Sequence, residues 1–273
     1  MTKEHDLIQS TPAPRTRQSL AADLRALGVV SGATVLVHSS MSALGWVCGG
    51  PVAVVQALRD VLTPSGTLVM PAHSSGLSDP AGWQNPPIPR AWWQTVRDEM
   101  PPFDPRTTPS RGMGRIAELF RTWPGSLRSA HPIVSFAACG PNAEIVTAGH
   151  TLEYGLGEGS PLARVYELDG FVLLLGVGHA NNTSLHLAEV RAGGAKQVIQ
   201  SAPVVEGGVR LWKRYQDVDW NDEAFPEIGA AFDETEHTKI GKAGSAEARY
   251  FPQRGAVDFA TRWLRDHGTA PRP

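Results

Sequence analysis

The pattern of apolar and polar positions divides the chain into short buried strands and amphipathic helices. Continuous apolar runs predict strands at residues 33–38, 67–71, 133–139 and 171–178. Apolar residues recur at helical spacing in residues 19–27, 51–62, 114–123 and 251–266. Residues 33–71 therefore form a strand–helix–strand unit. The pattern predicts an α/β fold whose mixed, mainly parallel central sheet is flanked by helices.

Two further segments have patterns of their own. Residues 204–215 favour a hairpin that turns at Glu206-Gly207-Gly208. Residues 72–112 contain eight of the chain's 22 prolines together with Trp83, Trp92 and Trp93, so we expect a long, ordered, functional loop. We predict a leader at residues 1–17, a single domain at 18–266 and a tail at 267–273.

Composition narrows the class of protein. The chain has 273 residues, 41% of them hydrophobic, and no apolar run approaches the length of a membrane span. Its first residues are polar, and its two cysteines lack a CxxC spacing, so we expect a cytoplasmic protein with reduced thiols. The net charge of −2, without a block of like charges, disfavours nucleic acid as a partner.

The strongest candidate for chemistry is a histidine that follows the last predicted strand. The sequence LLLGVGHANNTSLHLAEVR passes from a strand through a polar turn into a helix, so His186 lies in the first helical turn. Glu189 follows three residues later, on the same face. Because the positive end of the helix dipole disfavours an imidazolium, the spacing predicts a neutral general base that the carboxylate stabilises once it is protonated.

Three other segments have the composition of a ligand site. Residues 38–42 (HSSMS) follow a strand, at the edge where open α/β sheets bind ligands. Residues 107–115 (TTPSRGMGR) precede a helix and suit a phosphate group, although an ordinary capped loop has the same composition. Residues 217–236 are rich in acidic side chains, which fits either a solvated loop or a site for a polycation.

Familiar catalytic motifs are missing from the sequence. There is no Walker loop, GxGxxG, GxSxG or HExxH motif. His186 and Glu189 lack a second histidine at ligand spacing, so we expect no metal.

These segments together resemble the aminoglycoside 3-N-acetyltransferase family, over about residues 20–264. The resemblance is carried by LVHSSMSALGWVCGG, GTLVMPAHSSGLSDPAGWQNPP, WWQTVRDEMPPFDPRTTPSRGMGRIAE, RSAHPIVSFAACG, YGLGEGSPLARVYELDG, LLLGVGHANNTSLHLAEVR and FPEIGAAFD. It implies that a C-terminal α+β portion lines the acceptor site. It also implies transfer of an acetyl group from acetyl-CoA to the 3-amino group of a 2-deoxystreptamine aminoglycoside, by direct general-base-assisted attack.

The resemblance also assigns roles to residues. His186 is expected to be the base, with Glu189, Asp217 or Asp219 orienting it. Thr183, or a backbone N–H near it, is expected to stabilise the oxyanion. The expected contacts to CoA are His38, Ser39, Ser40, Met41, Ser42, Ser110, Arg111, Gly112, Met113, Arg115, Ser129, Ala130, His131 and Ser135. The carboxylates expected to face the amines are Asp79, Glu158, Glu189, Asp217 and Asp219. We expect a monomer or homodimer, with no nucleic-acid or membrane partner.

Three alternatives remain open from the sequence. The first is an acetyltransferase of the same fold that acts on a different amine, such as a metabolite or antibiotic precursor. The second is a metal-assisted amide hydrolase that uses His73, Asp79 and His186, which a metal analysis would distinguish. The third is a CoA-binding protein without catalytic activity.

Overall fold

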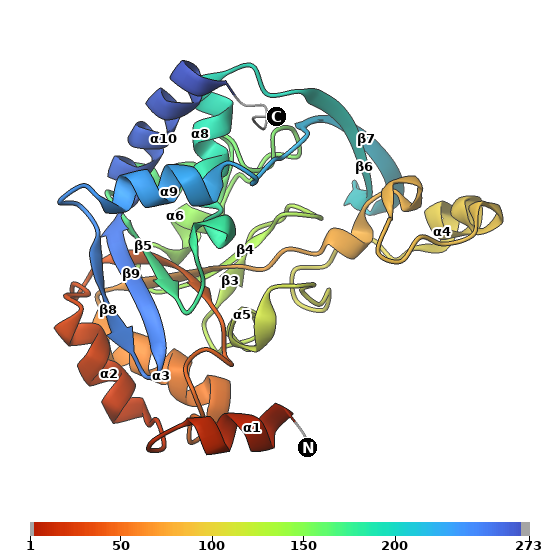
Figure 1. Ribbon diagram of the computed structural model, residues 1–273. Coiled ribbons are helices and arrows are strands. Elements are labelled where there is room, and N and C mark those ends of the chain that lie inside the picture. The colour runs from red at the N-terminus through yellow and green to blue at the C-terminus, as the bar shows by residue number, and fades with distance from the viewer. Residues whose placement is uncertain (1–2, 269–273) are drawn as a thin grey trace.

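Seven strands form one sheet in the order β3-β4-β2-β1-β5-β9-β8 in the computed structural model, which describes residues 3–268 (Figure 1). Their bounds are β1 Thr34–Ser39, β2 Thr67–Pro71, β3 Leu127–Arg128, β4 Phe136–Cys139, β5 Phe171–Leu175, β8 Lys239–Ala243 and β9 Ala246–Pro252. The predicted mixed α/β architecture is confirmed. Each strand expected from the apolar runs is present, with ends shifted by a few residues.

Parallel pairing covers less of the sheet than the sequence predicts. β1 lies parallel to both β2 and β5, whereas β4 pairs antiparallel with β2, and β9 pairs antiparallel with β5. β8 and β9 are joined by only Gly244 and Ser245, and a connection this short forces an antiparallel hairpin. The half-exposed edge strand β8 lacks the apolar run of the central strands, so the pattern did not indicate it.

Helices cover both faces of the sheet. One core lies under α2 (Arg17–Ala26), α3 (Gly50–Leu62) and α5 (Gly114–Arg121). The helices of the other face are α6 (Ala143–Thr147), α7 (Pro161–Glu167), α8 (Ser184–Ala192), α9 (Phe225–Asp233) and α10 (Gln253–His267). Within β1, Val35 and Val37 belong to the first core and Leu36 to the second, as the alternation of side chains requires.

The N-terminal segment is more ordered than a leader. α1 spans Lys3–Ser10, and the Thr11 hydroxyl accepts a hydrogen bond of 2.9 Å from the backbone N–H of Trp46. Arg15 forms a parallel bridge with Val47. These contacts join residues distant in sequence, so local polarity could not predict them. Of the predicted tail, α10 includes His267, whereas residues 269–273, like residues 1 and 2, lie outside the described part of the chain.

The long loop and the predicted hairpin form a projection beside the sheet (Figure 1). The hairpin is confirmed: β6 (Gln197–Glu206) and β7 (Val209–Val218) pair over their full length around Gly207-Gly208. Both glycines have positive φ, as a tight hairpin turn requires. The loop contains α4 (Trp93–Glu99), and the Arg210 side chain of β7 donates a hydrogen bond of 2.9 Å to the backbone carbonyl of Met100. The projection is therefore one packed unit.

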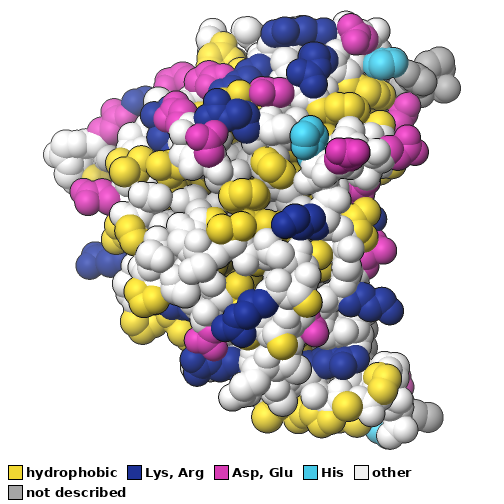
Figure 2. Space-filling view, turned by 90° about the vertical axis from the view of Figure 1, so that its left-hand side faces the viewer, with side chains coloured by type: hydrophobic (Ala, Val, Ile, Leu, Met, Phe, Trp, Pro, Cys, Tyr) yellow, Lys and Arg dark blue, Asp and Glu magenta, His cyan; other side chains and the backbone are white. Residues whose placement is uncertain are grey.

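Charged side chains of both signs lie on the surface of the protein. On the face drawn in Figure 2, Lys and Arg side chains are interspersed with Asp and Glu instead of gathering by sign. Within residues 3–268, no helix has both the length and the hydropathy needed to cross a bilayer. Cys48 and Cys139 are both unpaired.

Candidate active site

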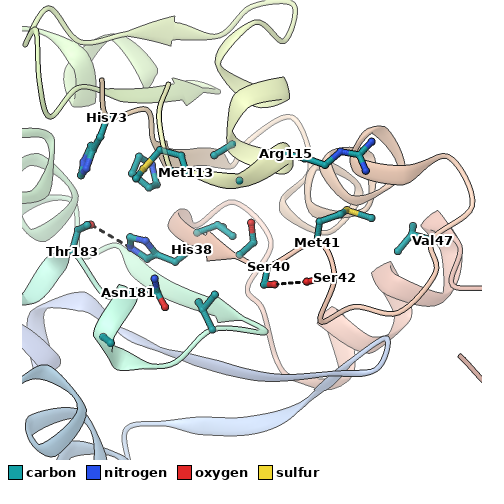
Figure 3. A pocket seen from close by; sticks show the side chains of 18 of the residues that line it. His38, Ser40, Met41, Ser42, Val47, His73, Met113, Arg115, Asn181 and Thr183 are labelled. Carbon is teal, nitrogen blue, oxygen red and sulfur yellow. Dashed lines mark hydrogen bonds between the residues drawn. The ribbon is translucent and has the colours of Figure 1, made fainter. Parts of the chain in front are cut away.

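A cavity of about 1330 Å³ opens at the C-terminal ends of the parallel strands (Figure 3). Residues 38–42 enter it after β1, His73 after β2, and Thr183 and His186 after β5. Gly112 to Arg115 close it from the start of α5. The residues converge because the carboxyl ends of parallel strands meet at one edge of a sheet.

The predicted base and its carboxylate are in contact. His186 Nδ1 lies 2.5 Å from Glu189 Oε2, and the two side chains are 13% and 3% exposed. The second oxygen of Glu189 accepts from the backbone N–H of Asn221 at 3.3 Å. The imidazole also packs against the rings of Trp220 and Phe225, with distances between ring centroids of 5.3 and 4.8 Å. A neutral imidazole that donates its Nδ1–H to the carboxylate has its lone pair on Nε2, so Nε2 is the nitrogen that can accept a proton.

Two other histidines at the cavity are uncharged at neutral pH. Burial, followed by the nearby charge of His186, lowers the pKa of His38 to about 3. Its Nε2 lies 3.3 Å from the hydroxyl of Thr183 (Figure 3). Burial also lowers the pKa of His73 to about 3, and in the described structure its Nε2 has no hydrogen-bond partner. His73 therefore offers a polar atom to a ligand.

His73 was not among the residues expected to touch CoA or the acceptor. The signal that could have found it is topological, because His73 comes just after the end of β2, and His38 lies at the end of the neighbouring β1. Two side chains that leave neighbouring parallel strands at the same edge lie close together.

The structure separates the residues expected to contact CoA into two groups. Those that line the cavity are His38, Ser39, Ser40, Met41, Ser42, Gly112, Met113 and Arg115. Those that do not are Ser110, Arg111, Ser129, Ala130, His131 and Ser135.

The second group has other partners in the fold. Ser110 donates through both its backbone N–H and its hydroxyl to Glu118. Ser129, His131 and Ser135 are buried, and the His131 ring accepts backbone N–H groups at 3.0 and 3.1 Å. These residues therefore stabilise the loop instead of lining the cavity. The motif RSAHP alone does not distinguish these two roles.

A second cavity of about 840 Å³ adjoins the first. The two share Val134 and Trp220, and Trp220 packs against His186. The charged residues of the second cavity are Asp79, Arg97, Arg214 and Asp217. Its walls come from the long loop and the hairpin. We refer to this second cavity as the acceptor cavity, after the role that the resemblance predicts for the portion of the chain that lines it.

Asp217 is the most perturbed carboxylate of the acceptor cavity. Burial raises the pKa of Asp217 to about 6, and a hydrogen bond from the backbone N–H of Val218 partly offsets this effect. Asp79 also lines the cavity, but both its oxygens bind the guanidinium of Arg97, at 2.7 and 3.1 Å.

The other carboxylates expected to face the amines lie elsewhere. Glu158 binds Arg191 at 2.7 Å, and Asp219 binds Lys196 at 2.9 Å. Neither residue lines either cavity, and each is paired with a cation instead. Glu189 stands behind His186 instead of facing a substrate. Of the three carboxylates considered for orienting the base, Glu189 is the one that contacts it.

Within residues 3–268, no three His, Cys, Asp or Glu side chains are grouped so that they could hold a metal ion.

A buried His–carboxylate pair at a large cavity, beside a tryptophan that also lines a smaller cavity, is an arrangement suited to a group-transfer enzyme. The family model for aminoglycoside 3-N-acetyltransferase matches residues 36–265, and the chain belongs to this family. The family predicted from the sequence is confirmed.

Named relatives match along nearly the whole chain. The SPbeta prophage-derived aminoglycoside N(3')-acetyltransferase-like protein YokD of Bacillus subtilis is 48% identical, over 94% of this chain and 95% of its own. Its crystal structure superposes with a TM-score of 0.96 at 46% identity, over 98% of this chain and all of that chain. Aminoglycoside N(3)-acetyltransferase VII of Streptomyces paromomycinus is 37% identical, over 95% of each chain. The AAC-IIIb binary complex with CoASH has a TM-score of 0.84 at 34% identity, over 96% of this chain and 100% of that chain.

Proposed function

We propose that the protein transfers the acetyl group of acetyl-CoA to the 3-amino group of a 2-deoxystreptamine aminoglycoside. The observation that carries this proposal is the His186–Glu189 pair, 2.5 Å apart, whose imidazole lines the larger cavity and packs against Trp220, a residue that lines both cavities. Membership of the family and the CoASH complex of AAC-IIIb support the choice of donor, and the relatives' names support the choice of acceptor.

The larger cavity offers suitable groups for CoA. Arg115 and the first turn of α5 provide positive charge and backbone N–H groups for phosphates. Gly112 and Gly114 have φ of +78° and +81°, a conformation that brings the backbone close to a ligand without side-chain interference. The hydroxyls of Ser40 and Ser42, 3.3 Å apart, and the unpartnered Nε2 of His73 complete a polar wall for the pantetheine amides.

The reaction is a direct transfer within a ternary complex. The amine nitrogen attacks the thioester carbonyl carbon, and His186 Nε2 takes a proton from that nitrogen. As the C–N bond forms and the C–S bond breaks, the imidazolium is stabilised by Glu189 and passes its proton to the departing thiolate. A positioned base contributes about 10²–10⁴-fold to the rate.

Thr183 is the candidate donor to the oxyanion of the tetrahedral intermediate. Its hydroxyl lies at the cavity and 3.3 Å from Nε2 of the neutral His38. If this nitrogen donates its proton to the hydroxyl oxygen, the hydroxyl proton is left to point at the oxyanion. Removing such a donor typically lowers kcat by about 10²–10³-fold.

A second candidate function is acetylation of a different amine by the same mechanism. It is favoured by one specific observation: two arginines, Arg97 and Arg214, line the acceptor cavity. In either case we infer a cytoplasmic enzyme that works as a monomer or homodimer.

The test is release of free CoA thiol in the presence of kanamycin, gentamicin, neomycin or apramycin, with mass spectrometry of the products. We expect a single acetyl group on the 3-amine, and loss of thiol release in His186→Ala. Intact acetyl-CoA binding without turnover on any of the four drugs would favour the second candidate. Thiol release without an acceptor, dependent on added metal, would favour the hydrolase.

A further inference from the structure

The charges of the acceptor cavity do not form an acidic surface. It is lined by two carboxylates, Asp79 and Asp217, and two guanidinium groups, Arg97 and Arg214. Asp79 is fully engaged, because it accepts from Arg97, from the backbone N–H of Ala81 and from the hydroxyl of Ser201. Asp79 and Arg97 therefore neutralise each other, and Asp217 and Arg214 remain to meet an acceptor.

Arg214 is the cation of this cavity that is free to bind a ligand. Within the described residues its guanidinium has no ion pair or hydrogen bond, and its side chain is exposed. It lies on β7 beside Trp212, which also lines the cavity, and it pairs across the hairpin with Ser201. A side chain two residues from Trp212 shares its face of the strand.

An acceptor with several ammonium groups would meet charges of both signs in this cavity. It would find one carboxylate that is free of an arginine, and it would bring its charges near an uncompensated guanidinium. An acceptor with one amine and one anionic group fits better, because Asp217 lies near the base and Arg214 supplies the opposite charge.

We propose that Arg214 forms an anion subsite in the acceptor cavity, so that among amines other than aminoglycosides the preferred acceptor also carries a phosphate or carboxylate group. This inference rests on the proposed acetyl transfer at His186 and develops its second candidate function. Trp212, Ile133 and Ile199 supply apolar walls between the amine end and the anion end of the acceptor.

The test compares three acceptors with the same 2-amino group: glucosamine, glucosamine 6-phosphate and muramic acid. Thiol release gives kcat/KM for each with the wild type and with Arg214→Gln. We expect at least one of the two anionic acceptors to exceed glucosamine about tenfold or more, as a charge-assisted hydrogen bond provides. Arg214→Gln should remove this advantage, so that the three acceptors have similar kcat/KM, while the KM for acetyl-CoA stays unchanged.

Lys213→Gln is the matched control. It removes one positive charge from the neighbouring position of β7, but Lys213 pairs with Glu206 and does not line the cavity. We expect it to retain the preference for the anionic acceptor. Loss of the preference in both variants would assign it to general surface charge and overturn the subsite.

The outcome for the subsite is separable from the outcome for acetyl transfer. Calorimetric binding of the three acceptors to the CoA-saturated protein reports on the subsite even if no acceptor is acetylated. Equal affinities for all three, or an anion preference that survives Arg214→Gln, would overturn the subsite. Thiol release with kanamycin but no preference among the amino sugars would support aminoglycoside acetylation and reject the subsite. An anion preference in binding without thiol release from any amine would retain the subsite and reject the proposed function.

Discussion

Replacing Asp217 by asparagine is expected to stabilise the protein, and to do so more strongly as pH rises. Burial raises the pKa of the Asp217 carboxyl from 3.8 to about 6 in the folded protein. Between these two values the unfolded chain has lost the proton while the folded protein retains it. Ionisation therefore favours the unfolded chain, and the wild type loses stability from this group as pH rises through this interval.

The size of the effect follows from the two pKa values. A shift of one pKa unit corresponds to about 1.4 kcal/mol, so the charged carboxylate costs about 3 kcal/mol at about pH 8. At about pH 4.5 the same linkage gives only about 1 kcal/mol. Asparagine keeps an oxygen that can accept the N–H of Val218, 2.9 Å away in the wild type. The variant should thus gain about 2 kcal/mol relative to the wild type between these two pH values.

The assay is urea unfolding of both proteins at several pH values between these limits, with the free energy of unfolding extrapolated to water. A constant difference between variant and wild type across the range would refute the assigned pKa shift. A second readout tests function: Asp217→Asn should weaken acceptor binding more than acetyl-CoA binding, and added salt should shrink the effect. Equal weakening of both ligands would indicate a folding defect. A variant that is more stable but binds its acceptor less well is the trade-off expected at a functional site.

Three further changes test other parts of the site. His186→Ala should lower kcat by about a hundredfold or more while calorimetry shows unchanged acetyl-CoA binding, and near-normal turnover would exclude His186 as the base. Thr183→Val should lower kcat by about 10²-fold without raising the KM for acetyl-CoA, and an unchanged kcat would shift the oxyanion role to another donor. Arg128→Met should lower the free energy of unfolding by about 3 kcal/mol, because the buried guanidinium donates hydrogen bonds to the carbonyls of Ala72 and Thr108. A loss below about 1 kcal/mol would contradict this account.

The central strands and the catalytic pair were predictable because both depend on short-range pattern. A run such as residues 171–175 is apolar at every position, and strands buried on both faces have this composition. His186 and Glu189 are three residues apart, so the helix alone places them on one face. No distant contact was needed for either prediction.

Features that depend on distant contacts were not predictable. The motif RSAHP gives no sign that Ser129 and His131 are buried, since their partners come from segments far along the chain. The neutralisation of Glu158 by Arg191 joins residues 33 positions apart. The acidic composition of residues 217–236 suggested a polycation site, but only the fold shows that these carboxylates disperse, with Asp219 at the surface and Asp233 bound to Arg249.

The residues proposed for the chemistry and those proposed for acceptor choice belong to different parts of this fold. The base and its carboxylate belong to α8, which packs against α10 and is buried in the second core, so their geometry is held by the whole domain. The acceptor cavity instead takes Arg97 from the long loop and Arg214 from the hairpin, both outside the seven-stranded sheet. An exposed residue such as Arg214 can change at little cost in stability, whereas a change at Glu189 leaves a buried imidazole without its partner. The acceptor can therefore change while the transfer step is preserved.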